Sequence, residues 1–426
     1  MRFLDVYLHE YLVGQLKQDD HGQMLFNYHE SWLGRKDSVV LSCSLPLRSE
    51  KFKRKDCRGF FSGILPEESK RDIIAGNLGI SAKNDFAMLE QIGGECAGAI
   101  TFIPAGTHLP DASQNTYRQL TQNELAAILR DLPHKPLLAG EDGVRLSLAG
   151  AQDKIALYIE ENQTFLPLGN AASSHILKPD HPRFNGLVFN EAFCMKLAKK
   201  IGLSVANVEI RTVEDVAYLM VERFDRLHVQ SGSDIKHSRI HQEDFCQALG
   251  IVSEMKYQSE GGPSLKDCFD LIRNVSSAPV NDLQAMLNAV IFNFIIGNHD
   301  AHGKNFSLIH DNLLLIPEKK LRGDSSEIRL APLYDLVCTA LYPDLSKKMA
   351  MKIGREYKSS DVSAKDFERM AEDIGFAKPL VKARVKELAQ KVLIEIEKID
   401  INHPVAKEVA NYIKAKCNAL LKLFEE

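Results

Sequence analysis

Apolar and polar positions alternate with a period of two at the start of the chain. The alternation covers Arg2–Leu8, resumes at Tyr11–Leu16 after a short turn, and continues through Met24–Tyr28. Because successive side chains of a strand point to opposite faces, this period predicts a β-meander with one buried face. The spacing becomes helical at Glu67–Asn77, directly after Pro66, a residue that suits the beginning of a helix.

A second region of mixed periodicity begins at Val144. Four short apolar stretches, separated by polar and turn-forming residues, predict strands. One longer stretch, Asn190–Ile201, has its apolar residues at helical spacing. The four predicted strands are Ile155–Ile159, Ser174–Lys178, Asn207–Arg211 and Ala217–Val221.

Helical spacing dominates from Gln242 to the C-terminus. Its clearest stretches are Ala285–Ile296 and the amphipathic Pro379–Ile399, and a charged hairpin is expected at 309–330. A β-rich lobe followed by a helical lobe predicts an α+β protein with a bilobal, kinase-like fold, in which the C-terminal lobe is all-α. The expected segments are 1–105 (β-rich), 106–143 (linker and a short helical segment), 144–226 (α+β) and 227–426 (helical lobe).

Composition narrows the class of protein. The 426 residues are 45% hydrophobic and carry a net charge of −4, which indicates a soluble globular protein and excludes a free-standing binder of polyanions. The eight cysteines include no C-x-x-C pair, so we expect reduced thiols in a cytoplasmic protein. The start of the chain lacks the apolar core of a signal peptide, and Ala289–Ile296 is too short to span a membrane.

The most informative polar stretch is Gly297–Phe306, which follows a predicted buried helix. It places Asn305 five positions after Asp300, and Asp335 follows a strand-like stretch, Ile328–Leu333, further along. In Mg-ATP phosphoryl transfer, one carboxylate orients the attacking hydroxyl and accepts its proton, while an amide oxygen and a second carboxylate hold the metal. We therefore predict that Asp300 is catalytic and that Asn305 and Asp335 bind Mg²⁺.

Two other interpretations of this stretch are open. It could be a solvated polar loop, or His299, Asp300 and His302 could bind zinc, although no H-E-x-x-H spacing supports a zinc site. If the stretch is catalytic, Lys304 is placed to neutralise charge on the transferred phosphoryl group.

Three further segments are candidates for binding a nucleotide. The loop Arg145–Lys154 has small residues that let backbone N–H groups approach phosphates, but it is not a Walker A motif, and a hairpin without a ligand explains it equally well. Lys178 ends a strand and could bind phosphates, paired with Glu191; an exposed lysine and an acidic residue in the first turn of a helix are the plainer explanations. Leu219–Asp225 could present backbone groups to adenine, or simply pack as the end of a strand.

These motifs, in this order, resemble the HipA family of serine/threonine kinases, the toxins of bacterial type II toxin–antitoxin pairs. The resemblance extends from the N-terminal Leu45-Pro-Leu47 to Asp335 and covers nearly the whole chain. Its motifs are Arg145-x-Ser147-x-Ala-Gly-Ala-Gln-x-Lys154, His175-Ile-x-Lys178, Val221-Glu-Arg-Phe-Asp-Arg226, Glu260-Gly-Gly-Pro263, Asp300-x-His-x-Lys-Asn-Phe-Ser307 and Pro332-x-Tyr-Asp335.

The resemblance implies the same roles for Asp300, Asn305 and Asp335, with ATP and Mg²⁺ as cofactors. It also implies autophosphorylation of Ser147, whose added negative charge would repel the phosphates of ATP and move the loop outward. The residues implied to surround ATP are Ala149, Gly150, Ala151, Gln152, Asp153, Lys154, Lys178, Glu222, Arg223, Phe224, His302, Gly303, Lys304, Asn305 and Tyr334.

The implied partners are a HipB-like helix-turn-helix antitoxin, operator DNA bound through that complex, and glutamyl-tRNA synthetase as the protein substrate. Near the basic run Lys347–Lys352, Arg355 and Lys358 are candidate contacts with DNA. The charged segment Glu318–Asp324 and the region after Leu345 depart from the family pattern. A small-molecule kinase of the antibiotic or sugar type and a catalytically silent co-repressor are the alternative functions.

Overall fold

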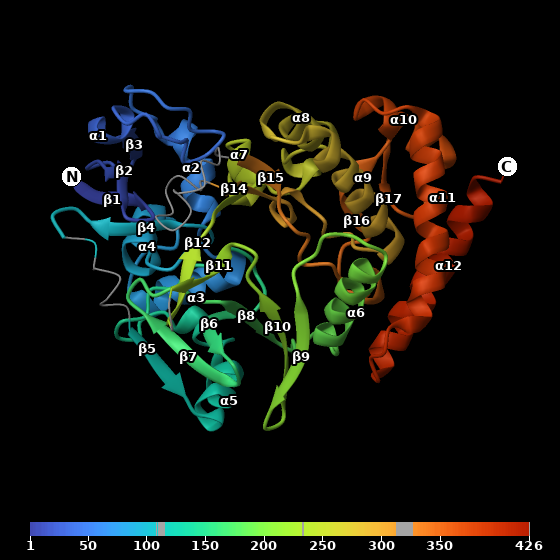
Figure 1. The fold of residues 1–426 in the computed structure, drawn as a ribbon, viewed down its shortest axis with the longest axis horizontal. Coiled ribbons are helices and arrows are strands. Elements are labelled where there is room, and N and C mark those ends of the chain that lie inside the picture. The colour runs from blue at the N-terminus through green and yellow to red at the C-terminus, as the bar shows by residue number, and fades with distance from the viewer. Residues whose placement is uncertain (108, 110–115, 232–233, 312–326, 426) are drawn as a thin grey trace. The chain divides into compact units, whose positions relative to one another are not determined.

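The computed structural model describes residues 1–107, 109, 116–231, 234–311 and 327–425, and Figure 1 labels its elements. The chain forms two compact units that are interleaved along the sequence. Unit 1 comprises Met1–Pro179, Arg211–Ser253 and Leu308–Ile328, and unit 2 comprises Asp180–Ile210, Glu254–Ser307 and Arg329–Glu426. The sequence predicted four segments that are each continuous along the chain, whereas each of these two units is assembled from three separate stretches. The four-segment division stays a prediction.

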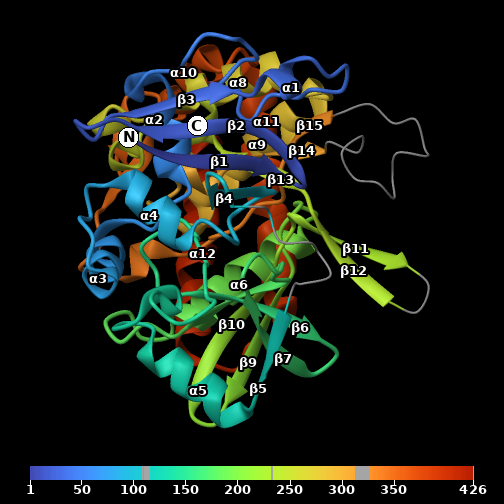
Figure 2. The same ribbon diagram turned by 90° about the vertical axis from the view of Figure 1, so that its left-hand side faces the viewer.

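The N-terminal meander is confirmed as an antiparallel sheet in unit 1. Its strands lie in the order β3-β2-β1-β4, as Figure 2 shows. Leu4, Val6 and Leu8 alternate inward on β1 and are fully buried, while α2 contacts β3 and α4 contacts β4. The elements are β1 (Arg2–Leu8), β2 (Tyr11–Gln18), β3 (Met24–Tyr28), α1 (Glu30–Leu33), α2 (Arg54–Gly63), α3 (Glu68–Leu78), α4 (Asp85–Ile92) and β4 (Ile100–Pro104).

A six-stranded sheet follows, in the order β5-β7-β6-β8-β10-β9. It contains all four strands that the sequence predicted in this region, and helix α5 packs against β8 and β10. The central strands β6, β8 and β10 are antiparallel neighbours. The elements are β5 (Thr116–Leu120), α5 (Gln122–Asp131), β6 (Ile155–Glu160), β7 (Gln163–Leu168), β8 (His175–Pro179), β9 (Val208–Val213) and β10 (Val216–Glu222).

Unit 2 contains the long helices. Helix α9 is almost continuously buried over its last eleven residues, Met286–Ile296, because α8, α11 and α12 all contact it. The predicted helices at Asn190–Ile201, Ala285–Ile296 and Pro379–Ile399 are confirmed as α6, α9 and α11. The helices are α6 (Leu187–Lys200), α8 (Leu265–Val275), α9 (Pro279–Ile296), α10 (Ala364–Asp373), α11 (Lys378–Glu395) and α12 (Pro404–Leu423). No helix among the described residues is both long and apolar enough to cross a membrane.

The α+β class, with a sheet-rich N-terminal region and helices toward the C-terminus, is confirmed. The C-terminal region also contains strands that the expectation of an all-α lobe did not include. Met349 and Met351 are buried on β16, so Lys347–Lys352 is largely a strand with an apolar face, a pattern that its charge obscured. The remaining strands and α-helix are β11 (Arg226–Ser231), β12 (Asp234–Arg239), β13 (His241–Asp244), α7 (Phe245–Ala248), β14 (Ser307–Asp311), β15 (Glu327–Leu330), β16 (Lys348–Ile353) and β17 (Glu356–Lys358).

The structure describes the two strands that begin and end the hairpin expected at 309–330. Strands β14 and β15 are hydrogen-bonded neighbours in a three-stranded sheet with β13. The segment between them, including Glu318–Asp324, lies outside the described residues.

Candidate functional site

Asp300 lies in the loop that follows helix α9. The helix ends at Gly297, whose φ of +69° is left-handed and whose Cβ, if present, would lie 2.6 Å from the ring of Tyr412. The side chain of Asp300 is 51% exposed. Its Oδ1 accepts a 2.6 Å hydrogen bond from the hydroxyl of Tyr257, and Nε2 of His302 lies 3.9 Å from its Oδ2. The carboxylate is therefore oriented by Tyr257 and still accessible, as a proton acceptor must be.

Asn305 is held on the same loop with its side-chain oxygen available. Its Nδ2 donates a 3.0 Å hydrogen bond to the backbone oxygen of Asp300, and its backbone N–H donates to His302. This assignment of the amide follows from the hydrogen-bond pattern. Because the nitrogen is engaged, Oδ1 is the atom that Asn305 can offer to a cation.

Asp335 has a left-handed backbone with φ of +53°, which is uncommon for a residue with a side chain. The regular strand β15 ends at Leu330. Beyond it, the backbone N–H of Leu333 donates a 2.8 Å hydrogen bond to the backbone oxygen of Ser204. Asn298 donates a 3.2 Å hydrogen bond from Nδ2 to the backbone oxygen of Asp335. The loops of Asp300 and Asp335 are thus tied together within unit 2.

Further polar residues, to which the sequence alone assigned no role, stabilise this arrangement. Thr339 accepts a 2.7 Å hydrogen bond from the backbone N–H of His299 and donates to the backbone oxygen of Gly297 at 3.1 Å. Asn190 on α6 binds both the N–H and the C=O of Cys338. Short polar side chains next to the motifs were the only signal in the sequence, and many such residues merely cap turns.

Tyr334 and the middle of the loop also contact each other. The hydroxyl of Tyr334 donates to the backbone oxygen of Lys304 at 2.8 Å and lies 2.6 Å from Oγ of Ser307. His302, Gly303 and Lys304 are buried. Four of the residues expected near ATP therefore pack together within unit 2.

The donor atoms of unit 2 suit magnesium better than zinc. Carboxylate and amide oxygens are the ligands that Mg²⁺ prefers. Among the described residues, His299, Asp300 and His302 do not form a group with metal-binding spacing. His299 instead has Nε2 3.2 Å from the hydroxyl of Ser359, and burial lowers its pKa. The zinc interpretation of this loop is not supported.

The loop Arg145–Lys154 belongs to unit 1 and curls around a lysine. Nζ of Lys154 donates a 2.8 Å hydrogen bond to the backbone oxygen of Ala149. Gly150 has φ of +105°, and a Cβ at this position would lie 2.6 Å from that Nζ. Asp153 is buried and forms an ion pair with Lys70. The glycine is thus required both by the backbone and by the close approach of the ammonium group.

Ser147 is completely buried in this loop. Its hydroxyl donates a 3.0 Å hydrogen bond to the backbone oxygen of Ile64. Its backbone N–H donates a 2.9 Å hydrogen bond to the backbone oxygen of Glu95. The hydroxyl cannot react with a nucleotide in this conformation, because no part of the side chain reaches solvent.

The other nucleotide-binding candidates of unit 1 lie on adjacent strands. In the pairing of β8 with β10, Lys178 is opposite Leu219 and Glu222 is opposite His175. These two pairs are three residues apart, or about 10 Å along the sheet. The loop Arg145–Lys154 leads directly into β6, the other neighbour of β8. Glu191 belongs to unit 2, and its pairing with Lys178 stays a prediction.

Three residues of the signature Val221–Arg226 take part in a buried network of ion pairs. We call it the Glu95 network, and it consists of Glu95, Arg223, Asp225, Arg226 and Arg239. Glu95 lies 3.1 Å from Arg223, 2.6 Å from Arg226 and 2.5 Å from Arg239. Arg223 and Arg226 also contact Asp225, at 2.8 and 2.9 Å. Burial alone would raise the pKa of Glu95, but Arg226, Arg239 and Arg223 hold it at about 2.

The network changes the interpretation of Arg223. Its guanidinium is fully engaged with Glu95, Asp225, Ser173 and the backbone of Cys96. The group that Arg223 can offer to a nucleotide is its backbone carbonyl. This network was not predicted, because nothing in the spacing connects Val221–Arg226 to Glu95, more than a hundred residues earlier.

Two family models match the chain, the HipA N-terminal domain over residues 4–103 and the HipA-like C-terminal domain over residues 146–396. The chain belongs to the HipA family. This HipA-family chain is 45% identical over 402 residues to Y4mE of Sinorhizobium fredii, a protein provisionally named a kinase, and the match covers 94% of this chain and 92% of that protein.

Two further comparisons concern Shewanella oneidensis. The chain is 29% identical over 443 residues to the serine/threonine-protein kinase toxin HipA of that organism, covering 99% of this chain and 97% of that protein. A chain in the solved complex of the S. oneidensis toxin–antitoxin system HipA, HipB and its operator DNA has a similar fold, with a TM-score of 0.81 and 28% identity, and the match covers 99% of this chain and 96% of that chain. The predicted family is thereby confirmed.

Proposed function

We propose that this HipA-family protein is an ATP- and Mg²⁺-dependent serine/threonine protein kinase that acts as a toxin. The observation that carries the proposal is the accessible carboxylate of Asp300, oriented by Tyr257 on the loop that also fixes Asn305. The similarity to a relative named a serine/threonine-protein kinase toxin supports it.

The roles of the residues follow from their chemistry. Asp300 orients the attacking hydroxyl and takes its proton as the oxygen–phosphorus bond forms. Asn305 Oδ1 and the carboxylate of Asp335 would hold magnesium, which neutralises the phosphates when it is bound. Lys304 would add positive charge beside the transferred group.

Candidate residues for binding the nucleotide are assigned in each unit separately. We assign the phosphates to the loop Ala149–Lys154 and to Lys178, and the adenine to backbone groups of Glu222–Phe224. Within unit 2, the candidates are His302–Asn305 and Tyr334. The order of strands in the sheet supports the unit 1 assignments. The loop Arg145–Lys154 precedes β6, Lys178 lies on the neighbouring β8, and Glu222 ends β10, the next strand.

Ser147 would be the site of autophosphorylation. In that step the γ-phosphoryl group moves from ATP to the Ser147 oxygen, ADP leaves, and the hydroxyl proton passes to a base. Since Ser147 is fully buried and bound to Ile64, the loop must first leave this position. The product carries about −1.5 to −2 charge and cannot return to a buried site without a large desolvation cost. Phosphorylation would therefore hold the loop out and switch the kinase off.

The proposed partners are a HipB-like antitoxin, operator DNA and a translation component such as glutamyl-tRNA synthetase. The similarity to a chain in a HipA–HipB–operator complex supports the first two. Arg355 and Lys358 are exposed on the β16–β17 hairpin, where Lys358 is paired with Lys348 across the strands. This basic edge is the proposed DNA contact, while the assignment of the protein substrate rests on the family resemblance.

Intact-mass analysis with peptide mapping after incubation with Mg-ATP tests the proposal. The protein is first treated with a phosphatase, which is then removed. The expected result is one added phosphoryl group on Ser147 of the wild type and none in Asp300→Ala or Ser147→Ala. Phosphate on small alcohols with none on Ser147 would identify a small-molecule kinase, and nucleotide binding without any turnover would identify a silent co-repressor.

A further inference from the structure

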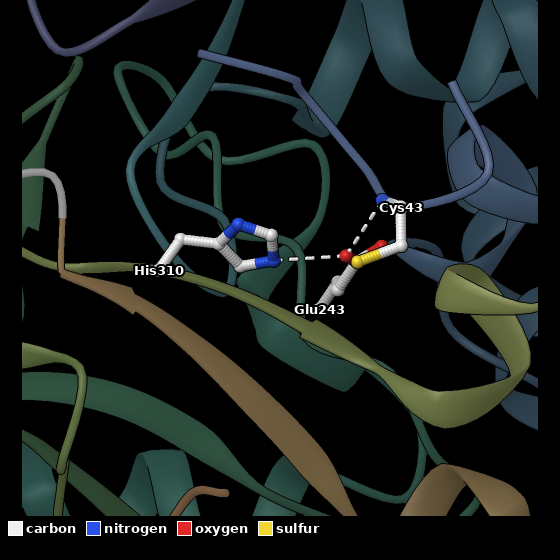
Figure 3. A group of neighbouring side chains, drawn as sticks. All are labelled: Cys43, Glu243 and His310. Carbon is white, nitrogen blue, oxygen red and sulfur yellow. Dashed lines mark hydrogen bonds and ion pairs between the residues drawn. The ribbon is translucent and has the colours of Figure 1, made fainter. Parts of the chain in front are cut away.

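Three side chains from distant parts of the sequence meet inside unit 1. Cys43 comes from the connection between α1 and α2, Glu243 from β13, and His310 from β14. Figure 3 shows the imidazole and the thiol on either side of the carboxylate. The sulfur, one ring nitrogen and one carboxylate oxygen all lie within 4.8 Å of one another.

We propose that Cys43, Glu243 and His310 form a zinc-binding site, with water or another small ligand in the fourth position. Thiolate, imidazole and carboxylate together select a borderline-soft divalent ion, since Mg²⁺ and Ca²⁺ prefer oxygen ligands alone. The site is independent of the proposed kinase activity, whose metal ligands are oxygens of unit 2.

The spacing suits tetrahedral coordination. Zinc–ligand distances of about 2.0–2.3 Å place tetrahedral ligands roughly 3.3–3.8 Å apart, so ligand atoms that already lie within 4.8 Å of one another need only small movements. On binding, the Cys43 thiol would lose its proton to solvent. The ring hydrogen of His310 would move from Nε2, which now lies 2.8 Å from Oε1 of Glu243, to Nδ1.

A second layer of hydrogen bonds already fixes the carboxylate. The hydroxyl of Ser42 donates to Oε2 of Glu243 at 2.5 Å, and the backbone N–H of Cys43 donates to Oε1 at 2.9 Å. Glu243 is 1% exposed and His310 is 2% exposed. Zinc sites commonly have such outer partners, which orient the ligand and restrict access of solvent.

Bound zinc would act as a structural cross-link. Residues 35–41, which lead to Cys43, form no helix or strand. The hydrogen bonds of Ser42 and Cys43 to Glu243 already attach this connection to β13. A metal bond from Cys43 to β13 and β14 would add to these bonds, and the energy of metal binding would add to the stability of the fold.

The test uses the full chain, loaded with Zn²⁺ or with Co²⁺ as a spectroscopic probe and then desalted. We expect one metal ion per chain and, with cobalt, a thiolate-to-metal charge-transfer absorption. Cys43→Ser should abolish this absorption, and Cys57→Ser, a control at a buried cysteine of helix α2, should retain it. No retained metal in the wild type, or an unchanged cobalt spectrum in Cys43→Ser, would overturn the proposal.

A second measurement needs no variant. Cys43 is the one cysteine that is partly exposed, while the other seven are buried. Zinc should slow the alkylation of Cys43 about tenfold or more relative to the metal-free protein, because a ligated thiolate is blocked. Equal alkylation of Cys43 with and without zinc would show that Glu243 and His310 form only a hydrogen-bonded pair.

Discussion

The side chain of Asn298 connects the two acidic residues of the candidate catalytic site. Its Oδ1 accepts a 3.2 Å hydrogen bond from the backbone N–H of Asp300, and its Nδ2 donates a 3.2 Å hydrogen bond to the backbone oxygen of Asp335. Nδ2 also donates to Asn293 at 2.8 Å. One buried amide therefore sets the separation of the proposed base and the proposed metal ligand.

Asn298→Ala should lower kcat by about 10- to 100-fold and raise the Mg²⁺ concentration needed for half-maximal activity, because misplaced catalytic groups lose much of their effect. A steady-state titration with Mg²⁺ at saturating ATP measures both values. Asn288→Ala is the matched control: Asn288 lies on helix α9, which precedes the loop, and binds Arg384 at 2.6 Å. An Asn298 variant with an unchanged Mg²⁺ profile would show that this residue only stabilises the fold.

Asp300→Asn should lower kcat by about two to four orders of magnitude, as expected for the loss of a base that also positions the substrate. The variant should fold normally, because the side chain is half exposed. Radiometric autophosphorylation measures the rate, and thermal unfolding checks the fold. Asp344→Asn, at an exposed residue of the same unit, should leave kcat unchanged. Near-normal activity of Asp300→Asn would exclude its role as the base.

Tyr257→Phe tests whether the 2.6 Å hydrogen bond to Asp300 orients the carboxylate. Removing only the hydroxyl keeps the edge-to-face contact of this ring with His302. A hydrogen bond to a charged group contributes about 1.5–3 kcal/mol, so we expect kcat to fall by roughly 10- to 100-fold, with little change in KM for ATP. An equal fall in affinity for ATP would instead indicate that Tyr257 binds the nucleotide.

Phosphorylated protein should be cut faster within the loop Arg145–Lys154 than unphosphorylated protein. Ser147 is fully buried before the reaction, and a phosphate there cannot be accommodated without moving the loop. Limited proteolysis followed by mass spectrometry measures the cleavage rate. Ser147→Ala, incubated with Mg-ATP in the same way, is the control and should be cut at the unphosphorylated rate. Identical cleavage of the two proteins would mean that the modified loop stays in place.

The sequence predicted those parts of the structure that depend on local patterns. The alternation of Arg2–Leu8 gave the correct bounds of β1, and the apolar spacing of Ala285–Ile296 gave the buried part of α9. Both patterns record burial directly, since one face of a strand or several faces of a helix must be apolar. The motif around Asp300 was also recognisable from a local pattern, because its residues lie on one short loop.

The sequence could not predict contacts that depend on the fold. Nothing near Glu95 indicates that it binds Arg226, and nothing near Asn298 indicates that it binds the backbone of Asp335. The positive charge of Lys347–Lys352 concealed strand β16, because the alternation of two buried methionines is a weaker signal than a run of lysines. Long-range polar pairing leaves no periodic trace, so it becomes visible only in the structure.

The Glu95 network should make stability depend on pH in the acidic range. The pKa of Glu95 is held at about 2 in the folded protein, below its ordinary value of 4.5. Its contribution is therefore fully present above pH 4.5, where it amounts to roughly 3 kcal/mol, and it is lost as the pH falls from 4.5 toward 2. Glu95→Gln should accordingly destabilise the protein strongly at neutral pH.

Denaturant unfolding of the wild type and Glu95→Gln at several pH values tests this. Removing one partner of a buried ion pair costs about 3–5 kcal/mol, and here Arg223, Arg226 and Arg239 all lose the charge of Glu95. The difference in the free energy of unfolding between the two proteins should shrink as the pH falls below 4.5, since protonated Glu95 also lacks the charge. Glu10→Gln, at an exposed turn, should differ from the wild type by less than about 0.5 kcal/mol at any pH. If the gap for Glu95→Gln did not change with pH, the three arginines would be stabilised by their hydrogen bonds and not by the charge of Glu95.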